Sequence, residues 1–189
     1  MANGAPFSSG SFMRGMLVRA VGSEEALEAL DDAPLPDEPF DWSGVPEDVH
    51  DVVAQWLDLS DRCADAMFDV EHRTVFRRFL ARVAIADPAV FRGRESPVRV
   101  AAALVWSAAR ANHTVGYGGS VVVKDLMAWF GLTGSVSQRA EPLLRAIGAE
   151  REVGPWTNLG DPRLLVARRR AQILEDRARW WCVTTAQRV

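Results

Sequence analysis

The sequence predicts an all-α protein, a compact helical domain built around one buried central helix. Two patterns lead to this prediction. Apolar residues recur every three or four positions from Val49 to Val83, which is the spacing of a helix that buries one face. The segment 97–111, PVRVAAALVWSAARA, is apolar on nearly all sides and rich in alanine, which indicates a helix with close neighbours on several sides.

The composition divides the chain into three parts. Residues 1–41 are expected to form a mobile or extended acidic N-terminal segment, in which 13–30 can form a helix. Its end, DDAPLPDEPFDW at 31–42, holds three prolines and five acids, which is typical of an extended linker. Residues 42–181 are expected to form the helical domain, and 182–189 a tail.

Helix boundaries within the domain follow from capping residues. Pro46 begins a helical pattern that ends at Asp87-Pro88, and its length predicts a break between Leu59 and Arg73. Ser96 is expected to cap the central helix, with Pro97 as its first residue. Only 121–123, VVV, resembles a strand. Asp161 and Pro162 are expected to begin the last helix, whose predicted apolar face is Leu164, Leu165, Ala167, Ala171, Leu174 and Ala178.

The stretch DLMAWFGLTGSVSQRAEPLLR, residues 125–145, reads as a helix, a turn at Gly131 and a second helix. In a DNA-binding helix-turn-helix the first residues of the second helix contact base edges, and Gln138 and Arg139 fall there. The turn before Val136 is expected to be one residue shorter than usual, and Pro142 removes a backbone hydrogen bond from the second helix. The sequence leaves two roles open for this helix-turn-helix-like pair: contact with DNA, or packing in the core of the domain.

Charge is distributed unevenly along the chain. The net charge is −3, but residues 1–75 carry sixteen acids and four arginines, or −12, while residues 76–189 carry eighteen basic side chains and nine acids, or +9. A basic half of this kind suggests an anionic partner such as double-stranded DNA, and equally an attraction between the two halves within one fold. The candidate nucleic-acid contacts are Arg92, Arg94, Arg99, Lys124, Gln138, Arg139, Arg168, Arg169 and Arg170.

Acidic residues form a second pattern before the central helix. Asp58, Asp61, Asp65, Asp69 and His72 share one helical face, and Asp69-x-x-His72 has the spacing of di-metal helical bundles. Such bundles need a second helix of the same kind, which the sequence lacks. The alternative is a solvated acidic face that pairs with arginines 77, 78 and 82. No metal ligand, cofactor or catalytic residue is therefore assigned.

Nucleophile and cofactor motifs give no support to an enzyme. Cys63 and Cys182 lie on apolar stripes, which favours buried, unreactive thiols. The sequence has no Gly-x-Ser-x-Gly, phosphate-loop, dinucleotide-binding or His-Glu-x-x-His motif. No apolar run is long enough to span a bilayer, so no membrane partner is expected and a cytoplasmic location is predicted.

Two resemblances add to this interpretation. FRGRESPVRVAAALVWSAARANH with VKDLMAWFGLTGSVSQRAEPLL, residues 91–145, resembles a cyclin-like repeat of the transcription factor IIB class. The chain has one such unit and no zinc ribbon. A wider stretch, residues 42–175 with VPEDVHDVV, FDVEHRTVFRRFLARV and LGDPRLLVARRR, resembles a family of actinobacterial helical-domain proteins of unassigned function. This second resemblance implies a helical domain and no chemistry.

Three functions follow as hypotheses. The first is a non-enzymatic cytoplasmic regulatory protein that associates with DNA through the helix pair and arginine patches. The second is a protein–protein interaction module that uses an apolar helical surface, with Trp180-Trp181 or the N-terminal helix as the docking element. The third is a metal-dependent helical-bundle enzyme centred on Asp65, Asp69 and His72.

Overall fold

A computed structural model of the chain describes residues 9–116, 118–149 and 157–186. Within these ranges the regular structure is entirely helical, which confirms the all-α prediction. Valines 115 and 121 form an isolated β-bridge where a strand was expected. The helices are α1 Ser9–Val21, α2 Glu24–Glu28, α3 His50–Met67, α4 Val70–Ala86, α5 Pro97–Ala111, α6 Val123–Trp129, α7 Ser137–Ala146 and α8 Ala167–Ala186, with short 3₁₀ turns η1 Glu47–Val49, η2 Pro88–Arg92 and η3 Pro162–Leu164.

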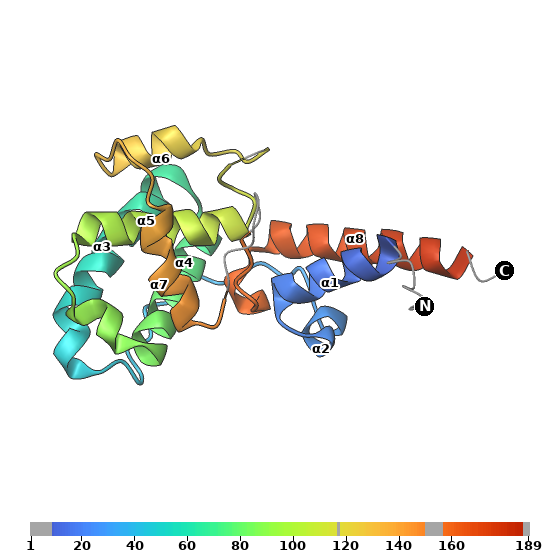
Figure 1. The fold of residues 1–189 in the computed structure, drawn as a ribbon, viewed down its shortest axis with the longest axis horizontal. Helices are drawn as coiled ribbons and strands as arrows, with labels where there is room; N and C mark the ends of the chain where they lie inside the picture. The colour runs from blue at the N-terminus through green and yellow to red at the C-terminus, as the bar shows by residue number, and fades with distance from the viewer. Residues whose placement is uncertain (1–8, 117, 150–156, 187–189) are drawn as a thin grey trace, which may run out of the picture.

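The helices form a large lobe and an arm (Figure 1). Helices α3 to α7 make up the lobe. In the arm, α1 packs against α8 and α2 packs against α1, and the start of α1 and the end of α8 lie toward the tip of the arm. The arm has a small apolar core of its own, in which Leu17, Val21 and Ile173 are buried together with Leu165.

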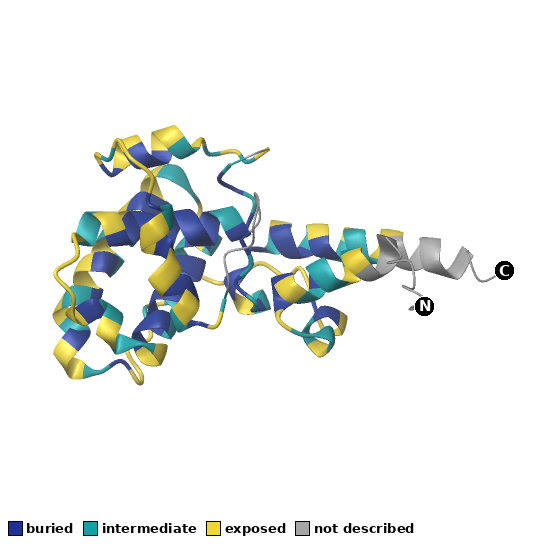
Figure 2. Cartoon of the chain, in the orientation of Figure 1, coloured by how far each residue is buried: buried dark blue, intermediate teal, exposed yellow. Residues whose placement is uncertain are grey.

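Helix α5 lies at the centre of the lobe, with the bounds that the sequence predicted. Residues 100–109 are all buried, and Figure 2 shows the helix dark blue along most of its length. Helices α3, α4, α6 and α7 pack against it. Its alanines permit this close packing because they add little bulk to any face. The one polar side chain in this run, Ser107, donates to Ala103 O within the helix at 2.7 Å.

The break expected between residues 59 and 73 is confirmed. Helix α3 ends at Met67, and Asp69 caps α4 by accepting a hydrogen bond from His72 N at 3.0 Å. Helix α4 ends at Ala86, as the Asp87-Pro88 pair predicted, and the Asp87 carboxylate accepts from Ala89 N at 3.2 Å in η2.

Helices α6 and α7 form the expected pair, with a different connection. Gly131 follows α6 with φ 67°, a backbone conformation that favours glycine and ends the helix. Residues 130–136 then join the helices, so the expectation of a shortened turn is wrong, because this connection exceeds the three or four residues of a DNA-binding helix-turn-helix. Pro142 lies on the exposed side of α7, and the helix continues past it to Ala146.

The last helix starts later than predicted. Asp161 and Pro162 begin the short turn η3, the backbone of Leu165 is extended, and α8 starts only at Ala167. Among residues 167–179 of this helix, the buried side chains are Arg169, Arg170 and Ile173, so the face turned inward differs from the predicted one. The predicted apolar face at positions 167, 171, 174 and 178 is only partly buried or exposed. Helix α8 also continues past residue 182, where a tail was expected.

The N-terminal segment packs against the rest of the molecule. A break at Gly22 separates α1 from α2; its φ is 98°, and a Cβ there would lie 2.2 Å from Gly160 O. Residues 31–42, here called the acidic strap, have no regular secondary structure and run along α4. Thr74 Oγ1 donates to Pro36 O at 2.7 Å, and Leu35 N donates to Glu71 Oε2 at 3.1 Å.

The junction between α5 and α8 depends on the amide of Asn112, which is buried. Its Nδ2 donates to Leu164 O at 3.0 Å and Ala108 O at 2.8 Å, and its Oδ1 accepts from Val166 N at 2.7 Å. Asn112→Ala leaves Leu164 O and Val166 N buried without these partners. We expect the free energy of unfolding in urea to fall by about 2–4 kcal/mol.

Gln138→Ala is the matched control, because it also removes an amide but at an exposed position. It should change the free energy of unfolding by less than about 0.5 kcal/mol. An Asn112→Ala protein as stable as this control would show that the amide does not hold the junction.

Candidate nucleic-acid interface

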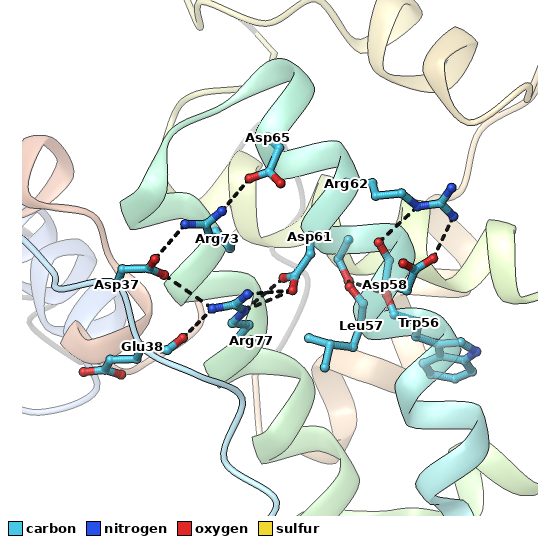
Figure 3. A network of polar contacts seen from close by, with 11 residues as sticks. Asp37, Glu38, Trp56, Leu57, Asp58, Asp61, Arg62, Asp65, Arg73 and Arg77 are labelled. Atoms are coloured by element: carbon cyan, nitrogen blue, oxygen red, sulfur yellow. Dashed lines mark hydrogen bonds and ion pairs between the residues drawn. The ribbon is translucent and has the colours of Figure 1, made fainter.

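Arginines on α4 form a network with acids from α3 and the acidic strap (Figure 3). Arg73 donates to Asp37 at 2.8 Å and to Asp65 at 2.6 Å. Arg77 binds Asp61 with two nitrogens, Nε at 3.0 Å and Nη2 at 2.7 Å. These guanidinium groups are partly buried, so dissolved salt weakens these ion pairs less than it weakens fully exposed surface pairs.

Two further arginines of α4 are paired farther along the helix. Arg78 binds the Glu38 carboxylate with Nε at 2.9 Å and Nη2 at 2.6 Å. Arg82 donates to Asp161 at 2.7 Å, and Arg163 donates to the same carboxylate at 2.8 Å. The predicted alternative, pairing of the acidic face with arginines 77, 78 and 82, is confirmed for Arg77, which binds Asp61. Arg78 pairs instead with Glu38 of the strap, and Arg82 with Asp161 before η3.

Asp161 is the most enclosed acid of this set, with a side chain 9% exposed. Burial alone would raise the pKa of its carboxyl, but hydrogen bonds from Arg163 and the charges of Arg163 and Arg82 lower it below the ordinary 3.8. The folded state therefore keeps this carboxylate ionised.

Two of the predicted nucleic-acid contacts are in the interior. Arg170 is buried and donates to Asp31 at 3.0 Å and to Ala33 O. Arg169 is also buried, contacts Gln172 at 3.2 Å, and burial lowers its pKa to about 10. Neither side chain can reach a DNA backbone, so the prediction for these two is corrected. Both lie on the face of α8 that carries the buried Ile173, and not on the predicted apolar face.

The remaining candidates divide between the two ends of α5, a helix of 15 residues and therefore about 22 Å long. Arg168 begins α8 beside the C-terminal end of α5, because Asn112 binds Val166 N there. Lys124 lies in the first turn of α6, close to the same end, because Val121 N donates to Thr114 O at 2.9 Å. Both side chains are exposed.

The other five lie at the N-terminal end of α5. Arg139, in the first turn of α7, forms an ion pair with Glu95 in the loop before α5. This contact places Gln138 and Arg139 beside Arg94 in that loop and Arg99 in the first turn of α5. All four side chains are exposed. Arg92 is exposed as well and pairs with Asp48 at 2.8 Å, which raises its pKa.

This region, here called the basic face, has three properties of an anion-binding surface. Arg94, Arg99 and Gln138 have no side-chain hydrogen bond or ion pair with any described residue, so they are available to a ligand. The helices α5 and α7 both begin here, and neither N-cap side chain accepts a hydrogen bond, although Ser137 N in the first turn of α7 donates to Ser135 Oγ at 3.2 Å. Their first-turn N–H groups and positive dipole ends favour a negative group.

Arg145 extends the basic face, and the sequence reasoning missed it. It is exposed on α7 seven residues after Gln138, which places both on one side of the helix. That spacing was the available signal.

The residues proposed for a metal have other roles. His72 is buried; its Nδ1 lies 2.7 Å from Asp69 Oδ1 and its Nε2 lies 2.7 Å from Thr114 Oγ1. Both ring nitrogens are thus occupied, and Asp65 binds Arg73. Across the described ranges, no group of three or more histidine, cysteine, aspartate or glutamate side chains could hold a metal ion.

Cys63 is buried, and burial raises the pKa of its thiol to about 12, which confirms an unreactive cysteine there. The side chains of Cys182, Trp180 and Trp181 lie outside the described residues. The exposed large apolar residues are spread over several elements, on α1, the acidic strap, both ends of α4 and both ends of α6: Phe12, Trp42, Val70, Ile85, Val122 and Trp129. A protein-interaction surface stays a prediction.

Comparison with known proteins identifies no relative: no family model, curated protein or solved structure matches the chain. The resemblances to cyclin-like repeats and to the actinobacterial family therefore stay predictions. In the part of the chain that the structure describes, no helix combines the length and apolar character needed to cross a bilayer.

Asp161→Asn tests the shared carboxylate through pH. Because the folded-state pKa lies below the ordinary value, the carboxylate stabilises the protein above about pH 4, and this stabilisation is lost as pH falls through the folded-state pKa. We expect the variant to be less stable than the parent by about 1–3 kcal/mol at pH 7. The difference should shrink toward pH 2 in denaturant melts.

Asp58→Asn is the control, because Asp58 pairs with Arg62 on the surface of α3. Its effect should stay below about 0.5 kcal/mol at every pH. Equal effects of the two substitutions at pH 7 would contradict a special role for Asp161.

Proposed function

We propose that this chain is a cytoplasmic regulatory protein that acts by binding double-stranded DNA, and that the basic face is its contact surface. The observation that carries the proposal is the Arg139–Glu95 ion pair, which brings the polar start of α7 to the arginine loop before α5. Three arginines and two helix N-termini then face one region, which suits the evenly spaced phosphates of a duplex.

The mode of contact favoured by this geometry is to the phosphate backbone. A reading helix inserts its first turns into the major groove, held by a short turn from the helix before it. Here the connection at 130–136 is long, and Pro142 stands on the exposed side of α7. Gln138 is exposed in the first turn of α7, and its amide suits contact with a base edge, so we expect any sequence preference to depend on it.

The acidic first half does not conflict with DNA binding, because several of its carboxylates are paired with arginines outside the basic face. Asp48 differs, because it pairs with Arg92 at the N-terminal end of α5. Asp37, Glu38 and Asp61 bind arginines of α4, and Asp31 binds Arg170. On the basic face itself the acid that pairs with the helix α7 arginine is Glu95. A chain of net charge −3 thus presents a local excess of positive charge.

Arg94→Gln/Arg99→Gln tests the proposal in a fluorescence-anisotropy titration of a labelled 20-base-pair duplex. The parent protein should bind at low salt, with log K falling against log salt at a slope of about −3 to −4. The double variant should lower the magnitude of that slope by about 2, because two phosphate contacts are lost.

Arg168→Gln is the matched control, since it removes an exposed arginine at the far end of α5. It should leave both affinity and slope unchanged. Absence of any binding by the parent protein at low salt would overturn the proposed function, and equal losses in the double variant and the control would overturn the assigned surface.

Glu95→Gln gives a second test, in which DNA affinity is expected to rise. The substitution removes a negative charge from the basic face and releases Arg139 from its ion pair. We expect DNA affinity at low salt to rise by about three- to tenfold, which is the effect of one added phosphate contact. Glu175→Gln, an exposed acid on α8, is the control and should bind like the parent. An unchanged affinity for Glu95→Gln would show that Arg139 does not contact DNA.

A further inference from the structure

A cleft of about 470 Å³ lies between the acidic strap, α4 and η3, and none of its lining residues belongs to the basic face. Its volume is within the range of small-molecule binding sites, about 300–1,000 Å³. The strap forms one wall, α4 the floor and η3 the other wall. The lining residues that matter here are Pro39, Asp41, Ala81, Arg82, Ile85 and Arg163.

The floor of the cleft is apolar. Ala81, Ile85 and Ala86 come from α4, and Pro39 and Leu164 stand on either side. The Ile85 side chain is 49% exposed, so α4 presents a large apolar group to solvent inside a concave surface. Covering this surface would remove apolar area from water, which favours a ligand with a hydrophobic body.

The η3 wall carries an excess of positive charge. Arg82 and Arg163 share the single carboxylate of Asp161, which neutralises one guanidinium of the two. Arg163 uses Nε and Nη2 for this contact, and its Nη1 has no partner among the described residues. The Arg163 side chain is 76% exposed, so Nη1 is accessible to a ligand.

The strap wall has the opposite character. Glu38 is neutralised by Arg78, and Arg77 by Asp61. The Asp41 carboxylate lies near Ser43, whose backbone N–H donates to it at 2.9 Å, and it pairs with no basic side chain in the described chain. A negative group in the cleft is therefore repelled from Asp41 and attracted to Arg82 and Arg163.

We propose that this cleft binds a small amphipathic carboxylate. Its hydrocarbon body lies on Ala81, Ile85 and Pro39, and its carboxylate accepts hydrogen bonds from Arg163 Nη1 and from Arg82 at the η3 wall. The cleft shares no lining residue with the basic face, so carboxylate binding here does not depend on whether the chain binds DNA. A ligand here also contacts the strap and α4 together, and its binding stabilises the folded chain.

Isothermal titration of the full chain with sodium octanoate at pH 7 tests the site. We expect one octanoate per chain, with a dissociation constant on the order of 1 mM or tighter for a ligand of this size. Octylammonium has the same hydrocarbon body and the opposite charge, and it should bind at least about tenfold more weakly. Absence of octanoate binding, or equal binding of the two probes, would overturn the proposal.

Two pairs of variants locate the bound octanoate. Arg163→Gln should weaken binding about tenfold through loss of a charged hydrogen bond, while Arg168→Gln, at an exposed arginine on α8, should not. Ile85→Ala should weaken binding about threefold or more through loss of apolar contact, while Val122→Ala, at an exposed apolar residue just before α6, should not. Octanoate binding that is the same in all four variants would place it elsewhere and overturn the assigned cleft.

Discussion

Enclosure of α5 is the constraint on which the rest of the structure depends. A helix apolar on every side must be covered on every side, and four helices of the lobe pack against it. Because the middle of α5 is buried among apolar side chains, the polar contacts between α5 and other segments lie near its two ends. At the C-terminal end Asn112 binds the chain that leads into α8. At the N-terminal end the loop before α5 meets the start of α7 through Glu95 and Arg139.

Pairing then decides which arginines remain available. The acidic strap and α3 supply carboxylates to the row of arginines on α4, and the strap also supplies Asp31 to Arg170. Through these ion pairs, the acidic first half and the basic second half of the chain bind each other within the fold. Arginine suits this role better than lysine, because its planar group binds a carboxylate with two nitrogens, as Arg77 binds Asp61. Among the described residues, the arginines without a carboxylate of their own include members of the small basic face, and one of the two that share Asp161 beside the cleft.

Local signals in the sequence were sufficient for much of the fold. The bounds of α5, the break before α4, the end of α4 at Asp87 and the end of α6 at Gly131 all follow from nearby residues. The start of α8 does not, because Val166 N binds Asn112, 54 residues earlier. Arg169 and Arg170 are buried on the face of α8 that also carries Ile173, which the local apolar pattern did not predict. The Arg139–Glu95 pair joins residues 44 apart, and the cleft joins three separate segments, so neither was accessible from local pattern.

The central claim is that the chain has two kinds of arginine, those committed to internal carboxylates and those open to phosphate. Hydrogen–deuterium exchange of the full chain, with and without a saturating DNA duplex at low salt, tests it most directly. The account predicts slower amide exchange at residues 93–99 and 137–145, and unchanged exchange along α4 and the acidic strap. Protection along α4, or faster exchange in the strap, would contradict the account, because it would mean that DNA competes for the internally paired arginines.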